Sequence, residues 1–107
     1  MGLDRSKLLS QANEIISKDR AATHGRAEDS FATIAAYWTV YLEKEFANTP
    51  YAAIKITPLH VAAMMALFKV ARLHNNPAHT DNWLDLIGYA ALGGEIALTN
   101  KIESKTK

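Results

Sequence analysis

The order of apolar and polar positions predicts an all-α protein, because apolar residues recur at the three- and four-residue spacing of half-buried helices. The first predicted helix follows Asp4 as its N-cap and runs to about Lys18. The second runs from about Ser30 to Phe46. No segment shows the strict alternation of a β-strand, and no internal repeat is present.

Two helices are apolar over more than one face. In the second, Tyr37 and Val40 widen the apolar arc, which predicts packing on two sides. The third helix begins at Thr57 and Pro58, a hydroxyl N-cap followed by proline at the first helical position. From Leu59 to Leu73 it is apolar nearly all round, which predicts burial on most sides. His60 is accordingly interpreted as a hydrogen-bonded core histidine.

The last helix, with Thr80 as its N-cap, combines acids with an apolar face. A helix turns by about 100° per residue, so one stripe contains Asp81, Asp85, Gly88, Leu92 and Glu95. A carboxylate on a helix face that packs against another helix is costly to bury, unless a basic side chain or a divalent cation lies beside it. Alternatively, Asp81 only favours the helix start through the macrodipole and Asp85 makes one ion pair.

The third predicted helix, the most apolar of the four, contains two basic side chains. Lys69 and Arg72 are three residues apart, so they share a face, and each ammonium or guanidinium must reach water or a carboxylate. The short link 74–79 makes the third and fourth helices antiparallel neighbours. The sequence therefore predicts that Lys69 or Arg72 pairs with Asp81 or Asp85.

The predicted architecture is four helices in a single domain over residues 1–107, with a charged tail at 101–107 that frays. The alternatives are a compact four-helix bundle and an intertwined oligomer. We expect a homodimer or higher oligomer, because the helices carry more apolar surface than one chain can hide. Gly88, Gly93 and Gly94 interrupt the last helix, which predicts that another helix crosses closely there.

The connection at residues 19–29 is unusually rich in charge for a linker. Arg20, His24 and Arg26 lie on either side of Gly25, which can adopt positive φ. Binding residues often lie on loops, so one hypothesis is that this segment binds phosphate or another anion. The alternative is a solvated turn that caps the next helix.

The amino-acid composition argues against several classes of protein, including nucleic-acid-binding and membrane proteins. The 107 residues include no cysteine, which fits a reducing cytoplasm, and 12 basic residues nearly balance 11 acidic ones. That balance argues against nucleic-acid binding, which favours a clustered basic face. No signal-peptide core or membrane-length apolar run is present. We therefore expect a soluble protein of the cytoplasm, with no membrane partner.

Two blocks carry a resemblance. The first comprises Asp19-Arg20, His24-Gly25 and the segment 31–42, and the second comprises the segments 61–73 and 81–91. Together they resemble, over residues 8–98, a family of small phage and prophage proteins of uncharacterised function. If a phage encodes this chain, we expect it in the host cytoplasm. That family in turn distantly resembles the all-α nucleoside triphosphate pyrophosphohydrolases of the MazG type, in which acidic residues on helices surround magnesium. This chain departs from that pattern because it has no Glu-Glu-x-x-Glu on a preceding helix.

The MazG-like resemblance implies a Mg²⁺-dependent nucleotide pyrophosphohydrolase. The catalytic residues would be Asp85 and Asp81, and the ligands of Mg²⁺ would be Asp81, Asp85, Glu28 and Glu95. The residues expected to bind substrate phosphates are Lys69, Arg72, Arg20, Arg26 and His24. The alternative is a non-catalytic helical dimer that binds a host protein or a nucleotide. In that case Lys69, Arg72, Asp81 and Asp85 form a structural ion-pair network.

Overall fold

The regular secondary structure of the described residues is helical, with no β-strand among them, which confirms the predicted all-α class. A computed structural model describes residues 4–19 and 27–106 and, within them, the side chains except those of 18–19, 27–28 and 100–106. Its α-helices are α1 (Arg5–Glu14), α3 (Ala27–Glu45), α4 (Pro58–Asn75) and α5 (Thr80–Thr106). A π-helical turn, η1 (Ile15–Asp19), extends α1, and a 3₁₀ turn, η2 (Pro50–Ala53), precedes α4.

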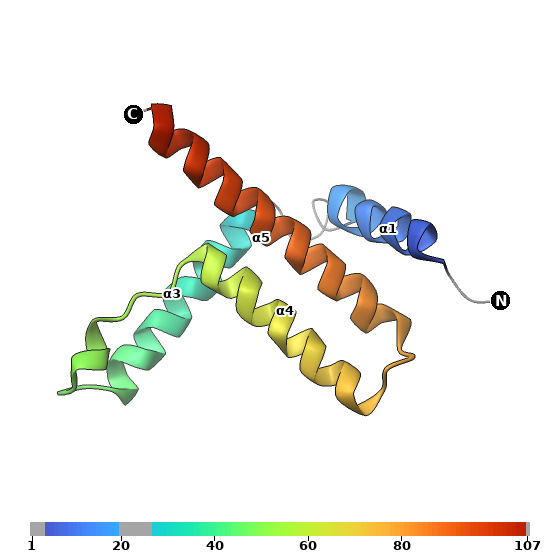
Figure 1. Ribbon diagram of the computed structural model, residues 1–107. Coiled ribbons are helices and arrows are strands. Elements are labelled where there is room, and N and C mark those ends of the chain that lie inside the picture. Colours follow the sequence, from blue (N-terminus) through green and yellow to red (C-terminus); the bar gives the residue numbers. More distant parts are fainter. Residues whose placement is uncertain (1–3, 20–26, 107) are drawn as a thin grey trace.

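The helices form an open arrangement around the α4–α5 hairpin (Figure 1). α4 and α5 run antiparallel, as the short link between them predicts. α1 lies along α5, whereas α3 packs chiefly on α4. The radius of gyration is 16.1 Å, compared with about 13 Å for a compact domain of this length. A single chain is therefore more open than a compact four-helix bundle.

The core lies where α3, α4 and α5 meet. Its buried members are Phe31, Ala35, Val61, Ala62 and Ile96. The small side chains of Ala35 and Ala62 let the helix backbones approach, while Phe31 and Val61 are the largest fully buried side chains. The ring of Tyr89 packs at the edge of this core, 6.1 Å from the ring of Phe31 between centroids.

Local hydrogen bonds explain where two helices begin. The Asp4 carboxylate accepts a hydrogen bond of 2.9 Å from the Lys7 backbone N–H, as its predicted N-cap role requires. The Thr57 hydroxyl accepts from the His60 N–H, and His60 Nδ1 accepts from the Thr57 N–H at 3.1 Å. His60 is exposed, so the prediction of a core histidine is wrong. It completes a capping box.

The start of α3 also differs from the prediction. α3 begins at Ala27 instead of near Ser30. This earlier start places Asp29 in the first turn, where a carboxylate is favourable beside the positive end of the helix macrodipole. α5 begins at Thr80, and its backbone is helical to Thr106, through most of the tail that the sequence predicts to fray.

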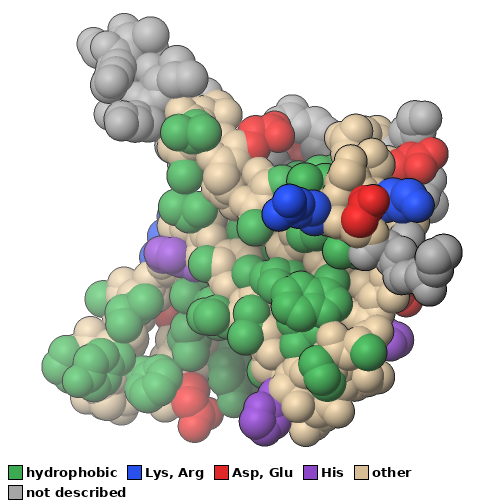
Figure 2. All heavy atoms as spheres, turned by 45° about the vertical axis from the view of Figure 1, so that its right-hand side comes forward, with side chains coloured by type: hydrophobic (Ala, Val, Ile, Leu, Met, Phe, Trp, Pro, Cys, Tyr) green, Lys and Arg blue, Asp and Glu red, His purple; other side chains and the backbone are tan. Residues whose placement is uncertain are grey.

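The predicted burial of α3 and α4 on several sides is wrong for a single chain. Tyr37 is 73% exposed on α3 and Leu67 is 67% exposed on α4. α1 packs on α5 and not on α4, which leaves these faces without a neighbouring helix among the described elements. Figure 2 shows hydrophobic side chains spread over one side of the molecule, from the end of α3 and η2 at the lower left towards the centre. No described helix is long and apolar enough to cross a membrane.

Candidate functional site

The α4–α5 hairpin carries an ion pair between two predicted site residues. Lys69 Nζ on α4 lies 3.0 Å from Asp85 Oδ2 on α5, and their side chains are 15% and 40% exposed. This contact confirms the prediction that Lys69 or Arg72 pairs with Asp81 or Asp85. The Lys69 ammonium also lies 5.5 Å from the centroid of the Phe68 ring. Because Lys69 is mostly buried, loss of the Asp85 carboxylate would destabilise the protein more than loss of a partner at the surface would.

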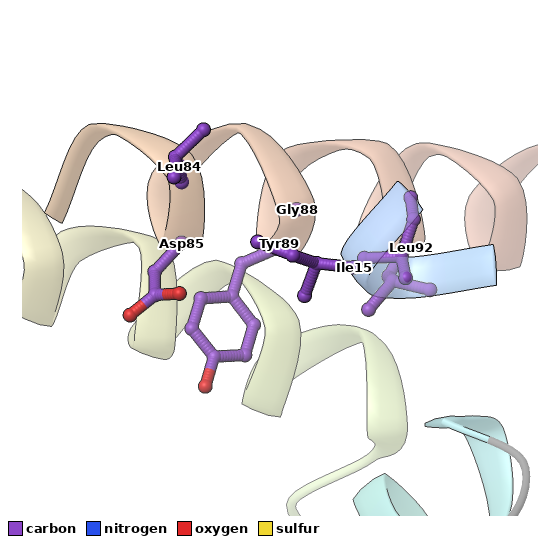
Figure 3. Close-up of a pocket in the computed structure, with 7 residues that line it drawn as sticks. Ile15, Leu84, Asp85, Gly88, Tyr89 and Leu92 are labelled. Atoms are coloured by element: carbon purple, nitrogen blue, oxygen red, sulfur yellow. The ribbon is translucent and has the colours of Figure 1, made fainter. Parts of the chain in front are cut away.

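A small cavity lies beside this ion pair, between α5 and η1 (Figure 3). It is lined by Ile15, Ile16, Leu84, Asp85, Gly88, Tyr89 and Leu92. Its volume is about 30 Å³, which is enough for about one water molecule and far too small for a nucleotide. Asp85 and Tyr89 point from α5 to the same side, towards α4.

Gly88 lets η1 approach α5 beside this cavity. A Cβ atom on Gly88 would lie 3.3 Å from Ile16 Cγ2, so a larger residue would require the Ile16 side chain to shift. The close helix crossing predicted from the glycines is therefore confirmed at Gly88. Nothing lies within 4 Å of the corresponding position at Gly94 among the described residues.

The described acids do not converge on a common point. Asp81 and Glu95 are exposed side chains on α5, one before and one after Asp85. Within the described ranges, no group of three or more histidine or acidic side chains is placed to hold a metal ion. The Glu28 side chain lies outside the described part, so the predicted Mg²⁺ set stays a prediction.

The predicted phosphate-binding residues fall in three places. Arg20, His24 and Arg26 lie outside the described residues. Lys69 is held in the ion pair with Asp85. Arg72 is exposed near the end of α4, with its guanidinium carbon 5.6 Å from the centroid of the Phe68 ring, and it borders a polar hollow. Among the described residues, the predicted ion pair is thus made by Lys69 and not by Arg72.

Sequence reasoning missed Asn82, which is buried in the same hollow. The spacing of residues along α5 could have predicted that Asn82 is buried. Asn82 stands seven and fourteen residues before Tyr89 and Ile96, both of which face the core. Residues seven apart lie on nearly the same side of a helix, so the polar Asn82 falls on the core-facing stripe of α5.

An apolar groove lies between α3 and the start of α4, and the sequence did not predict it. It is lined by Trp38, Tyr41, Leu42, Ile56 and Met64 and has a volume of about 460 Å³. The Thr39 hydroxyl fixes one wall, because it accepts a hydrogen bond of 2.9 Å from the Ile56 N–H and donates one of 3.4 Å to the Ile56 carbonyl. These hydrogen bonds tie the segment before α4 to α3, so the two walls of the groove are joined.

The chain is similar to two curated phage proteins. It is 35% identical to the Gene 55 protein of Mycobacterium phage L5 over 85 residues, which cover 79% of this chain and 49% of that protein. It is 32% identical to the Gene 55 protein of Mycobacterium phage D29 over 83 residues, or 78% and 48%. The chain thus spans about half the length of these relatives. No solved structure matches it.

These relatives confirm the resemblance to phage proteins, whereas no likeness to the MazG type is found. Residues 7–97 match a family described as a domain of unknown function. That match extends from α1 through most of α5, and so includes the ion pair, the groove and the hollow. The chain therefore belongs to the family "Domain of unknown function (DUF6378)".

Proposed function

We propose that the protein is a non-catalytic helical binding protein that works as a homo-oligomer, with the α3–α4 surface joining the copies. We define this surface as the apolar groove together with the exposed residues Tyr37, Val40, Leu67 and Phe68. Leu67 and Phe68 are 67% and 47% exposed. Exposed apolar surface of this extent is typical of a protein–protein contact.

The balance of buried and exposed side chains is the observation that carries the proposal. Among the described residues, more large hydrophobic side chains are exposed than are buried. A stable monomer of this size hides most such side chains in its own core. An interface that is permanent resembles a domain core cut in half, and α3 and α4 have that character.

A second copy is the occupant that fits these faces best. The exposed apolar residues extend over both α3 and α4, and the radius of gyration of 16.1 Å leaves the arrangement open. A second copy of the chain has the same apolar surface, so an interface with two-fold symmetry can bury both surfaces against each other. A host protein that covers the same surface is the competing outcome.

Sedimentation velocity of the purified chain tests the proposal. We expect a dimer or larger species at micromolar concentration that persists on dilution, since obligate helical interfaces are extensive. A folded monomer at this concentration would contradict self-association and would leave the surface to another protein.

Nucleotide pyrophosphohydrolysis is a second candidate. It is supported by Asp81 and Asp85, one helical turn apart on α5, with the cation of Lys69 3.0 Å from Asp85. In this hypothesis Mg²⁺ is held by Asp81, Asp85 and a further acid such as Glu28 or Glu95, and bound Mg²⁺ would neutralise phosphate charge. Lys69, Arg72 and the residues Arg20, His24 and Arg26 would contact phosphate oxygens.

The two functions differ in their response to Mg²⁺. A hydrolase should show a higher melting temperature with Mg²⁺ and should release pyrophosphate from a nucleoside triphosphate. A binding protein without a metal site should show neither effect. The combination of no stabilisation and no pyrophosphate from any of the common nucleoside triphosphates would reject the hydrolase.

A further inference from the structure

A polar hollow lies where α4 ends and α5 begins. It has a volume of about 370 Å³ and is lined by Arg72, Asn75, Asn76, His79 and Asn82. Arg72 and Asn75 come from the last turns of α4, Asn82 comes from the first turn of α5, and the other two come from the link between them. Its volume falls within the range of small-molecule sites, about 300–1,000 Å³.

Asn82 is the unusual member of this lining. It is 4% exposed, and within the described part of the chain its side chain makes no hydrogen bond. A buried amide carries two N–H donors and a carbonyl acceptor, and nearly all such groups in folded proteins have partners. The free amide of Asn82 therefore points to a partner that enters through the hollow.

The rest of the lining is equally free to bind. Across the described residues, the side chains of Arg72, Asn75, Asn76 and His79 accept or donate no hydrogen bond, and Arg72 has no carboxylate partner. Arg72 offers a fork of N–H donors, and each amide offers two more. No acidic side chain lines the hollow. The hollow is thus rich in donors and positively charged.

The start of α5 strengthens this character. The N-terminus of a helix carries partial positive charge and unpaired N–H groups. The two described acids near the start of α5, Asp81 and Asp85, do not line the hollow, and Asp85 is paired with Lys69. A donor-rich pocket with an arginine suits a ligand that carries negatively charged oxygen atoms.

We propose that this hollow binds a small oxyanion, a phosphate or carboxylate group, between the Arg72 guanidinium and the Asn82 amide. Arg72 would supply charge and paired N–H donors, and Asn82 would supply a buried donor that fixes the position of the anion. The proposal requires neither self-association nor hydrolysis, so it can fail or succeed independently of both.

Nuclear magnetic resonance titration of the full chain tests this site with two probes, inorganic phosphate and acetate. We expect saturable shifts of the Asn82 side-chain amide and of the first turn of α5 with at least one probe. A response to one probe identifies the charged group, and a response to both indicates a general oxyanion site. No saturable shift with either probe would overturn the proposal.

Matched variants locate the binding. Arg72→Gln should weaken binding by about tenfold or more, because it removes a charge-assisted hydrogen bond. Lys44→Gln makes the same change in charge at an exposed position on α3 and should leave the affinity unchanged. Equal losses in the two variants would mean that binding follows net charge alone, and would contradict the site.

Asn82→Leu separates a binding role from a structural one. Leucine has a similar size and needs no hydrogen bond, so the variant should lose binding while its melting temperature rises by about 4 °C or more. A lower melting temperature with binding retained would show that Asn82 serves the fold and would overturn its assigned role. If this variant does not fold, the exposed Arg72→Gln variant still decides the question.

Discussion

Gly93 on α5 faces Ala62 on α4 so closely that a Cβ atom on Gly93 would lie 3.1 Å from Ala62 Cβ. Ala62 is 1% exposed and its Cβ is fixed to the backbone of α4, so it cannot turn aside. The absence of a side chain at Gly93 therefore sets the spacing of the α4–α5 hairpin. This contact bears out the close crossing expected from a glycine inside a helix.

Gly93→Ala and Gly94→Ala should consequently have opposite effects on stability. Gly94 has open space around it among the described residues, so alanine there should stabilise the fold by about 0.5–1 kcal/mol through helix propensity. At Gly93 the same gain is outweighed by overpacking, which typically costs about 1–3 kcal/mol. Urea unfolding of both variants checks the prediction. A lower stability for Gly94→Ala would indicate a contact at Gly94, for example with a second copy.

Asp85→Asn should destabilise the protein, because it leaves the mostly buried Lys69 ammonium without its charged partner. Breaking a fully buried pair costs about 3–5 kcal/mol. Asp85 is 40% exposed, so we expect about 1–3 kcal/mol, since solvent screens the charge. Thermal melts with and without Mg²⁺ measure the loss and also test the hydrolase hypothesis. A loss of the Mg²⁺ response at little cost in metal-free stability would favour a metal-binding role for Asp85.

Asp81→Asn is the matched control for this experiment. Asp81 is exposed in the first turn of α5, where a carboxylate contributes about 0.3–1 kcal/mol through the helix macrodipole. We expect a smaller loss of stability than for Asp85→Asn. Equal losses would mean that the ion pair with Lys69 contributes little.

Leu67→Glu should dissociate the proposed oligomer. Leu67 is 67% exposed in the single chain, so a charge there has little effect on the fold of one copy. In an interface the same carboxylate would be buried without a partner, at a cost of several kcal/mol. Sedimentation of the variant should show a folded monomer. An unchanged oligomer would place the contact elsewhere than on this face of α4.

Thr57→Ala should lower stability by about 1 kcal/mol, because the Thr57 hydroxyl and the His60 ring close the capping box at the start of α4. Thr49→Ala, which removes the N-cap of the short η2 turn, should cost less because few core contacts depend on η2. Urea unfolding of the two variants provides the comparison. A larger effect at Thr49 would show that η2, and not the α4 cap, controls the stability of this region.

Much of the helical arrangement follows from sequence because its causes are local. Asp4 and Thr57 cap helices through hydrogen bonds to residues three positions along the chain. The Lys69–Asp85 pair was predictable for a related reason, since a short link confines two consecutive helices to antiparallel contact. The sequence thus predicted the starts of α1 and α4 and an ion pair between α4 and α5, and the structure shows which two of the four candidate side chains form the pair.

The exposed faces and the burial of Asn82 depend on how the helices pack against one another. Leu67 is exposed because no described helix packs over it. The spacing of apolar residues shows that a helix face is apolar but does not show which helix will cover it. Asn82 is buried because the end of α4 and the start of α5 enclose it. The sequence by itself determined the all-α class, the starts of α1 and α4 and the antiparallel pairing of α4 with α5. Only the tertiary structure decided which apolar faces stay open and which polar side chain is buried, because burial depends on how the helices pack together and not on the pattern of any one helix.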